Sequence, residues 1–390
     1  MVKESFEMIA KTLYGFEDLL AEELRNLGGE KVKVGNRSVS FYGDTGFMYK
    51  ANLCARTALR ILKPLQRKKI RNEQDLYRLV QSIDWSSFMG IEDTFAIYST
   101  VYSTVFTHSQ FVSLKAKDAI VDQFKKNTGQ RPNVDTQYPD LTIHIHIHET
   151  LCTISLDSSG ESLHQRGYRS KTNVAPINEV LAAGLLLASG WRGQSDFLDP
   201  MCGSGTIVIE AAMIACNIPA NLNRKEFAFE KWLDWDMDLF ETIEASCLKK
   251  IRNFDYKIIG RDIHASTIRK AKTNVETANL SEFIQLEQMD FFESEKESDR
   301  SLFMVFNPPY GERMELDIES FYEDIGNTLK QNYPDTQAWF ITSNLEALKS
   351  VGLRPSRKIK VYNGKLESRF VKYEIYKGSK KAKYQDIQNP

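Results

Sequence analysis

Cysteine is scarce in this chain. Its 390 residues include five cysteines, an odd number, and no two of them form a Cys-x-x-Cys pair. This pattern argues against a disulfide scaffold and against a cysteine zinc site. It is typical of a protein that works in a reducing compartment, so we expect a cytoplasmic location.

The sequence also lacks long apolar runs and an excess of charge of one sign. No stretch approaches the roughly 18 apolar residues of a membrane helix, and acidic residues stand where a signal peptide would have its apolar core. The 51 Lys and Arg residues balance 52 Asp and Glu residues, which excludes a globally basic nucleic-acid binder. Local basic clusters remain at residues 63–71 and 354–360, and each can be a solvated face or a contact surface for a polyanion.

What is present is the composition of an ordinary globular protein, with 42% hydrophobic and 26% charged residues. The length predicts two or three domains. The first half mixes alternating runs with amphipathic stretches, which is an α+β pattern. It predicts helices at 16–27 and 111–126 and strands at 32–42, 95–105 and 141–156.

The second half alternates predicted strands and helices, which is typical of a parallel, doubly wound α/β sheet. Residues 217–256 interrupt this alternation like an insertion, and their aromatic residues more simply form local core than line a substrate entrance. Strands are predicted at 195–199, 257–261, 283–288, 302–306 and 337–342, and helices at 177–190, 206–216, 265–279 and 320–332.

A glycine-containing loop follows the strand predicted at 195–199. In this loop, DPMCGSGT at 199–206, Gly203 and Gly205 allow the backbone to approach a ligand closely. The loop has neither the third glycine of a dinucleotide fingerprint nor the Gly-Lys-Ser/Thr of a P-loop. Asp199 would repel a pyrophosphate but attract a cation, such as the sulfonium or ammonium of S-adenosylmethionine. A plain loop with an incidental acid is the alternative.

Two further acids follow the next predicted strands. Asp262 comes directly after the strand at 257–261 and is placed to bind the ribose hydroxyls of a nucleoside cofactor. Asp290 follows the strand at 283–288 and could bind the exocyclic amine of adenine, with Phe291 against the ring. A helix-capping role for Asp290 is the alternative.

The buried strand predicted at 302–306 runs directly into the tetrad Asn307-Pro308-Pro309-Tyr310. Proline ends a strand ladder and fixes φ, so we expect a rigid turn at the carboxyl edge of the sheet, where doubly wound folds hold ligands. The Asn307 side-chain oxygen and the Pro308 carbonyl can accept two N–H bonds from a planar amine, which makes its nitrogen more nucleophilic. Tyr310 can stack on a base that has left its helix.

Two other motifs receive a structural interpretation. Cys202 lies in the glycine loop, and no Pro-Cys pair of a C5-pyrimidine methyltransferase occurs, so we interpret Cys202 as loop packing. His144, His146 and His148 share one face of a strand and could bind a metal, but no cysteine or acid cluster completes the set. We therefore expect a polar strand face and no metal.

Together these segments resemble the THUMP-associated class I methyltransferases. The resemblance covers about residues 1–375, and it is close to the N-terminal half of the bifunctional large-subunit rRNA methyltransferase K/L. Many similar chains carry the older designation of N6-adenine-specific DNA methylase. The motifs that carry it are 199–213 and 307–314, with 117–122, 131–132, 156–157, 163–169 and 175–179 upstream.

The resemblance implies a Rossmann-like class I methyltransferase sheet, S-adenosylmethionine as the cofactor and structured RNA as the partner. The implied segments are an N-terminal ferredoxin-like segment at 1–44, a THUMP RNA-binding domain at 45–157, a linker and helix at 158–190, a methyltransferase domain at 191–377 and a flexible tail at 378–390. Catalytic roles are expected for Asn307, Pro308, Pro309 and Tyr310. Cofactor contacts are expected from Asp199, Met201, Cys202, Gly203, Ser204, Gly205, Asp262, Ile263, Asp290, Phe291 and Asn307. RNA contacts are expected from His164, Arg166, Tyr168, Arg169, Lys68, Lys69 and Arg71, although residues 163–169 can instead be a structural junction.

These expectations favour an RNA methyltransferase that acts on the exocyclic N2 of guanine in 23S rRNA. A tRNA guanine-N2 enzyme and a DNA adenine-N6 enzyme are alternatives, because the tetrad suits adenine, cytosine and guanine amines alike. A non-catalytic RNA-binding assembly factor is a third alternative, against which the intact loop and tetrad argue.

Overall fold

The computed structural model describes residues 4–169, 177–309 and 317–377, so Tyr310 of the predicted tetrad and the predicted tail lie outside the described residues. The chain divides into two compact units, and each is described by itself. Unit 1 comprises Met1–Thr12, Leu20–Leu163 and Arg224–Ser246, and unit 2 comprises Leu13–Leu19, His164–Asn223 and Cys247–Pro390. In the described ranges, no helix combines the length and apolar character needed to cross a membrane.

Unit 1 is built on an eight-stranded sheet in the order β2-β3-β1-β4-β8-β7-β5-β6. Neighbouring strands are antiparallel except around β5, which runs parallel to β7 and β6. The run predicted at 32–42 forms a hairpin, and the α+β interpretation of this half is confirmed. The strands are β1 (Phe6–Thr12), β2 (Glu30–Gly35), β3 (Ser38–Gly43), β4 (Ala58–Lys69), β5 (Thr94–Tyr102), β6 (Asn133–Val134), β7 (Leu141–His148) and β8 (Leu151–Asp157).

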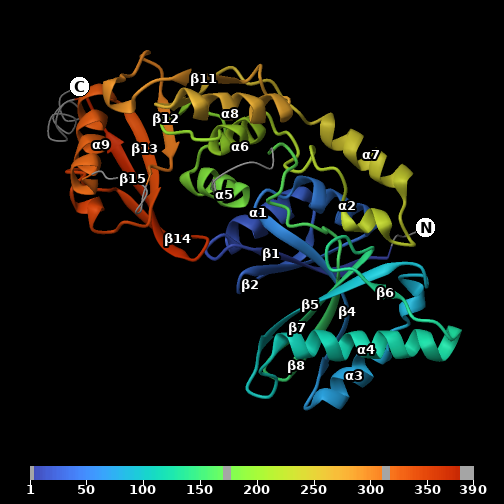
Figure 1. Ribbon diagram of the computed structural model, residues 1–390. Coiled ribbons are helices and arrows are strands. Elements are labelled where there is room, and N and C mark those ends of the chain that lie inside the picture. Colours follow the sequence, from blue (N-terminus) through green and yellow to red (C-terminus); the bar gives the residue numbers. More distant parts are fainter. Residues whose placement is uncertain (1–3, 170–176, 310–316, 378–390) are drawn as a thin grey trace. The chain divides into compact units, whose positions relative to one another are not determined.

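Two helices pack together on one face of this sheet (Figure 1). Helix α4 (Ser109–Thr128) lies against β5, where Ser113 Oγ is 2.8 Å from Ser99 Oγ, and it ends at Gly129, whose φ of +77° suits a helix C-terminus. Helix α3 (Glu73–Gln81) packs beside α4, with the Tyr77 hydroxyl donating to Asp122. The other helices of this half are α1 (Glu17–Leu27) and α2 (Thr45–Cys54).

The predicted insertion contributes its middle part, residues 224–246, to unit 1. It contains a short 3-10 helix, η2 (Ala228–Lys231), and helix α7 (Met237–Leu248). The ring centroid of Tyr49 on α2 is 4.5 Å from that of Phe229 and 5.1 Å from that of Trp235. Phe227, Phe229 and Trp232 are buried. These aromatic residues are core, as predicted.

Unit 2 contains a seven-stranded sheet in the order β11-β10-β9-β12-β13-β15-β14. The first five strands are parallel, and an antiparallel hairpin, which the sequence did not predict, completes the edge. The strand order reverses between β9 and β12, which is the point where doubly wound folds bind ligands. The strands are β9 (Asp196–Asp199), β10 (Ile258–Asp262), β11 (Ile284–Gln288), β12 (Leu302–Phe306), β13 (Thr336–Thr342), β14 (Arg357–Asn363) and β15 (Leu366–Ile375).

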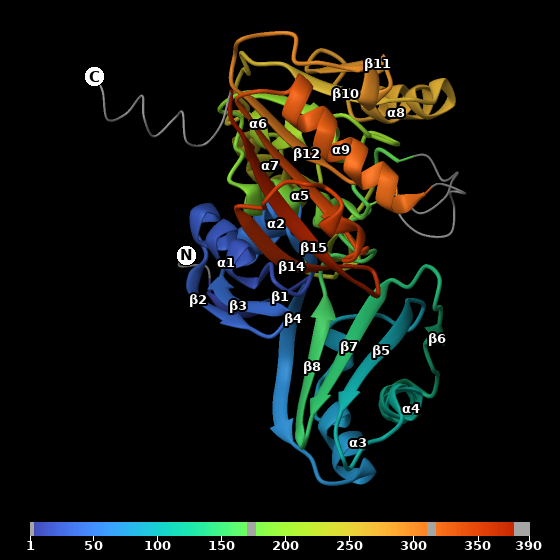
Figure 2. The ribbon, with the colours of Figure 1, turned by 90° about the vertical axis from the view of Figure 1, so that its left-hand side faces the viewer.

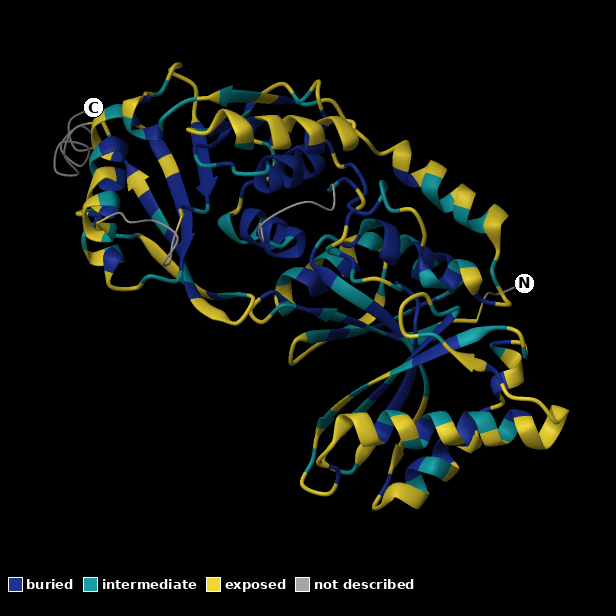
Figure 3. Cartoon of the chain, viewed as in Figure 1, coloured by how far each residue is buried: buried dark blue, intermediate teal, exposed yellow. Residues whose placement is uncertain are grey.

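Both faces of this sheet are covered, which confirms the doubly wound interpretation. Helices α5 (Glu179–Ser189), α6 (Thr206–Ala215) and α8 (Ala265–Thr277) share one core with Phe303 and Val305. Helix α9 (Ile318–Asn332) shares the other core with Met304 and Phe306. The apolar run of β12 therefore faces both layers, as is usual for a buried parallel strand. Figure 3 shows α5 and α6 almost wholly buried.

Candidate active site

The glycine loop connects β9 to α6 and carries a buried acid at its start. Asp199 is 1% exposed, and its Oδ1 accepts a hydrogen bond from the Met201 amide at 3.1 Å. Gly203 and Gly205 have φ values of +55° and +85°, and Gly205 precedes the first turn of α6. A Cβ on Gly203 would meet no atom within 4 Å, so the space beside this backbone is open to a ligand.

Asp262 lies at the end of β10 and reaches the same loop. Its Oδ2 accepts from the Gly203 amide at 3.2 Å, and its Oδ1 accepts from the His264 amide at 2.9 Å. Burial, reinforced by the charge of Asp262, raises the pKa of Asp199 well above its usual range. Two carboxylates held this close form a site that a cationic ligand stabilises. Asp199 therefore fits the cationic groups of the predicted cofactor, and Asp262 fits its ribose hydroxyls.

Cys202 packs within the loop, as predicted. A Cβ on Gly260 of β10 would lie 3.2 Å from its sulfur, and the Cys202 amide donates to the Arg261 carbonyl at 2.7 Å. Burial raises the pKa of the Cys202 thiol well above its usual range, so the group stays neutral. A neutral, packed thiol is a poor nucleophile.

Asp290 follows β11 and caps the short 3-10 helix η3 (Phe291–Glu293), where its Oδ1 accepts from the Phe292 amide at 2.9 Å. The predicted contact between Phe291 and adenine needs correction, because Phe291 is 2% exposed and packs against Phe306 and Tyr333. Ile263, which follows β10 and is 52% exposed, offers apolar surface at this edge instead.

Asn307 follows β12, which pairs with β9 so that Met304 lies opposite Leu198. Asp199 ends β9 and Asn307 follows β12, so both lie at the carboxyl edge of adjacent strands, whose axes are about 5 Å apart. The Asn307 Oδ1 atom is buried and has no hydrogen-bond partner among the described residues. Pro308 is buried and Pro309 is exposed. A buried acceptor without a partner is costly, so its position points to a ligand that donates a hydrogen bond.

The predicted RNA contacts of Arg166 and Tyr168 are wrong, because both residues are 1% exposed. Arg166 Nε donates to Glu210 Oε1 at 3.1 Å, and its Nη1 donates to Asn221 Oδ1 at 3.1 Å. A guanidinium enclosed in this way cannot reach a phosphate. The alternative of a structural junction holds for these two positions.

Arg169 is also engaged with the protein. Its Nη2 donates to Thr206 Oγ1 at 2.8 Å and lies 3.3 Å from Glu179 Oε1. Thr206 and Glu210 are four residues apart on α6, so the two arginines hold the same face of the helix that follows the glycine loop. Glu179 and Glu210 were not predicted. The sequence feature that could have identified them is an acidic residue within an otherwise apolar helix, because a buried acid requires a buried partner.

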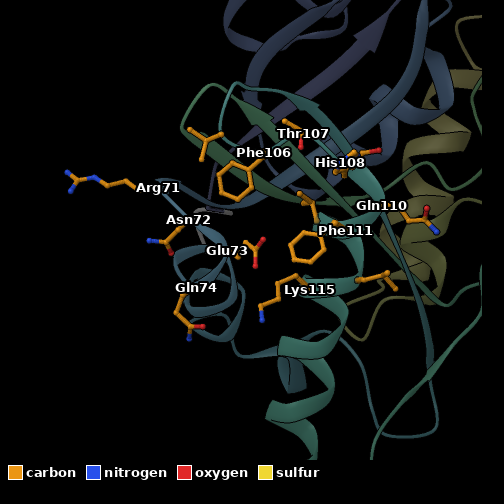
Figure 4. Close-up of a pocket in the computed structure, with 14 residues that line it drawn as sticks. Arg71, Asn72, Glu73, Gln74, Phe106, Thr107, His108, Gln110, Phe111 and Lys115 are labelled. Carbon is orange, nitrogen blue, oxygen red and sulfur yellow. The ribbon is translucent and has the colours of Figure 1, made fainter.

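The remaining predicted RNA contacts are partly or fully exposed. His164 is half-buried, whereas Lys68 and Lys69 are exposed near the end of β4 and Arg71 follows them. Figure 4 shows Arg71 at a hollow of about 1190 Å³ in unit 1, where the first turns of α3 and α4 meet. Phe106, His108, Phe111 and Lys115 are among the other lining residues.

Comparison with protein families matches three segments of the chain. Residues 7–62 match the RlmL ferredoxin-like domain, residues 71–157 the THUMP domain, and residues 166–372 the RMKL-like methyltransferase domain. The boundaries near 44, 157 and 190 expected from the sequence remain predictions.

Similar proteins are found along almost the whole chain. A candidate RNA methyltransferase of Synechocystis sp. is 37% identical over 93% of this chain and 95% of its own length. A candidate methylase of Clostridium difficile 630 is 32% identical, with a TM-score of 0.86 over 97% of this chain and 100% of its own. The candidate methyltransferase SMU.472, solved with S-adenosylhomocysteine, is 28% identical with a TM-score of 0.85 over 97% and 100%.

A predicted N6-adenine-specific DNA methylase of Listeria monocytogenes is also 28% identical, with a TM-score of 0.85 over 95% of this chain and 97% of its own. The matching domains, the strand order of the unit 2 sheet and the positions of Asp199 and Asp262 all agree with a methyltransferase fold. The chain therefore belongs to the RMKL-like methyltransferase family, in the form that joins an RlmL ferredoxin-like domain and a THUMP domain to the methyltransferase domain.

Proposed function

We propose that this protein methylates the exocyclic N2 of a guanine in 23S rRNA. The methyl donor is S-adenosylmethionine, and the substrate is RNA. The observation that carries the choice of an exocyclic amine is the buried Asn307 Oδ1 after β12, which has no hydrogen-bond partner among the described residues. The choice of guanine and of 23S rRNA rests on the resemblance to the rRNA enzyme.

S-adenosylmethionine, when bound, supplies an electrophilic methyl group on a sulfonium. Asp199 and the closely approaching backbone of Gly203 and Gly205 would hold its methionine part, and Asp262 would hold its ribose. Asp290 and Ile263 would meet the adenine. We propose further contacts from Met201, Cys202 and Ser204 through their backbone.

Asn307 and Pro308 prepare the acceptor. The Asn307 Oδ1 atom and the Pro308 carbonyl each accept one N–H of the exocyclic amine, which withdraws the nitrogen lone pair from the ring and directs it out of the plane. Pro309 restricts the turn that holds them. We propose that Tyr310 stacks on the base. His164, Arg169, Lys68, Lys69 and Arg71 remain proposed RNA contacts.

The test is transfer of labelled methyl to three acceptors: undermodified 23S rRNA, bulk tRNA and genomic DNA. Label recovered as N2-methylguanosine from 23S rRNA is the expected result. Asn307→Ala should lower the rate by about two orders of magnitude, as with loss of one oriented hydrogen-bond partner in other enzymes, while cofactor still binds. Asn253→Ala, at an exposed position of unit 2, is the matched control.

DNA adenine-N6 methylation is a second candidate, because the tetrad suits adenine and the Listeria neighbour is named for that reaction. N6-methyladenine in DNA would establish it and refute the rRNA proposal. Transfer to tRNA alone would show that the substrate is tRNA and not 23S rRNA. Cofactor binding without transfer to any acceptor would favour a non-catalytic assembly factor.

A further inference from the structure

Among the described residues, no helix packs on one face of the strands β4, β8, β7 and β5 of unit 1 (Figure 2). Helix α4 covers the face that bears Ser99, and Ile145, which pairs with Ser99, is buried on that side. Side chains alternate along a strand, so Tyr98 and His144 lie on the opposite face. Figure 2 shows strands β4, β8, β7 and β5 with α4 to one side of them. We call this surface the open face. Its residues are Lys11, Arg67, Lys69, Tyr98, Tyr102 and the histidines at 144, 146 and 148.

Aromatic rings and imidazoles occupy adjacent strands of the open face. Tyr98 pairs with His144, and their rings stack with centroids 5.6 Å apart at 29°. The rings of Tyr102 and His146 are 6.0 Å apart. Tyr98 is 45% exposed and Tyr102 is 61% exposed, so both rings are accessible to a ligand. The two tyrosines stand about 13 Å apart along β5, at about 3.3 Å per residue.

Two acids at the open face are paired with cations, so they do not offset the charge of its lysines. Asp157 is fully buried and pairs with both Arg60 and His144, and these partners keep the pKa of the carboxyl below its usual range. Glu7 pairs with Arg67 at 3.3 Å.

Two lysines supply this charge. Lys69 lies opposite Leu151, which in turn lies opposite His148, so the three residues share the face. In the part of the chain that the structure describes, no carboxylate lies within ion-pair distance of Lys69. Lys11 approaches His146 closely enough to help burial lower the pKa of that imidazole.

The histidines do not point to a metal. His144 is engaged with Asp157, and among the described residues no three ligating side chains converge as a metal site requires. Exposed aromatic rings beside cations are instead the features that hold single-stranded nucleic acid, in which bases stack and phosphates seek charge.

We propose that the open face binds a single-stranded segment of the substrate RNA, with bases stacked on Tyr98 and Tyr102 and phosphates beside the cations of β1 and β4. This inference rests on the proposed RNA methyltransferase function. It places RNA on a sheet surface to which the basic run of β4 contributes Arg67 and Lys69.

The test measures the Kd of the full chain for an unstructured 12-nucleotide RNA by fluorescence anisotropy. Tyr98→Ala with Tyr102→Ala should weaken binding by roughly tenfold or more, since one stacked base contributes about 1–3 kcal/mol. Replacing both tyrosines by Phe should leave the Kd within about twofold. Tyr256→Ala, at an exposed tyrosine of unit 2, is the control.

Unchanged binding by the alanine variant would overturn the proposal. So would a preference for duplex RNA of the same length. Should the variant fail to fold, ultraviolet crosslinking of the wild-type protein to 4-thiouridine RNA decides, because the proposal requires crosslinked peptides from β5 or β7.

The experiments distinguish a failure of the proposed function from a failure of the docking proposal. If the wild type binds the oligonucleotide through the tyrosines but methylates DNA alone, the docking surface stands and the rRNA proposal falls. If the alanine variant binds and methylates rRNA normally, the rRNA methyltransferase proposal is supported and RNA binding at the open face is refuted.

Discussion

Arg166 Nε donates to Glu210 Oε1 at 3.1 Å, and neither side chain is exposed to solvent. Arg169 donates to Thr206, the first residue of α6, which lies one helical turn before Glu210. Arg166 and Arg169 therefore hold α6, the helix that follows the glycine loop. A buried charge that loses its partner costs far more than the intact pair contributes.

Arg166→Met should therefore destabilise the protein by about 3–5 kcal/mol, because it leaves Glu210 buried without its cation. Urea unfolding measures the loss. Arg357→Met, at an exposed position of β14, should change the free energy of unfolding by less than about 0.5 kcal/mol. Equal stability of the two variants would contradict a stabilising role for the pair with Glu210.

The pKa of Asp199 predicts that cofactor binding depends on pH. Burial and the charge of Asp262 raise this pKa, so below it the free protein holds a proton on Asp199 that a cationic ligand displaces. Affinity for S-adenosylmethionine should rise with pH through the pKa of the free protein, with proton release on binding. Calorimetry in two buffers of different ionisation enthalpy measures that release.

Asp199→Asn is the matching variant. A raised folded-state pKa means that wild-type stability falls as pH rises from the unfolded pKa to the folded pKa. The variant lacks this loss. At pH values above that window and without ligand, it should therefore melt at a higher temperature than the wild type. It should nevertheless bind the cofactor more weakly than the wild type does. Equal proton release by variant and wild type would assign the titration to another group.

Gly203→Ala should separate folding from binding. A Cβ there would meet no protein atom within 4 Å, and the φ of +55° costs about 1 kcal/mol for alanine. The methyl group would enter the space left for the cofactor, so affinity should fall at least tenfold while the fold persists. Gly190→Ala, with φ of +88° and equally open surroundings at the end of α5, is the control and should keep cofactor affinity.

Glu179 should make stability fall as pH rises. Burial raises its pKa from 4.5 to about 7, despite the pair with Arg169. Between these values the folded state holds the proton more tightly, so about 3 kcal/mol of stability is lost as pH rises from 4.5 through 7. Glu179→Gln should flatten this part of the profile of melting temperature against pH. The exposed Glu282→Gln should leave it unchanged.

Local features of the sequence were sufficient for much of unit 2. The apolar run of β12 and the prolines after it placed Asn307 at a strand end. The helix predicted at 177–190 is α5, where Asn178 Oδ1 accepts from the Leu181 amide and Gly190 has a positive φ. The two acids at the ends of β9 and β10 followed from the same alternation of strands and helices.

Unit 1 was harder to predict, because its longest strand does not look like one. β4 carries the basic run at 63–71, whose charges hide the strand pattern, and it is stabilised by pairing with β1 and β8. Strand propensity is weak evidence when cross-strand partners decide the pairing.

The sequence by itself determined the order of elements, the glycine loop and the tetrad, because short-range periodicity and turn chemistry are written along the chain. Only the tertiary structure decided that Arg166, Tyr168 and Phe291 are buried, that residues 224–246 pack in unit 1, and that Tyr98 and Tyr102 share an exposed face with the histidines. The physical reason is that burial and ion pairing depend on residues brought together from distant positions, which one-dimensional patterns do not specify.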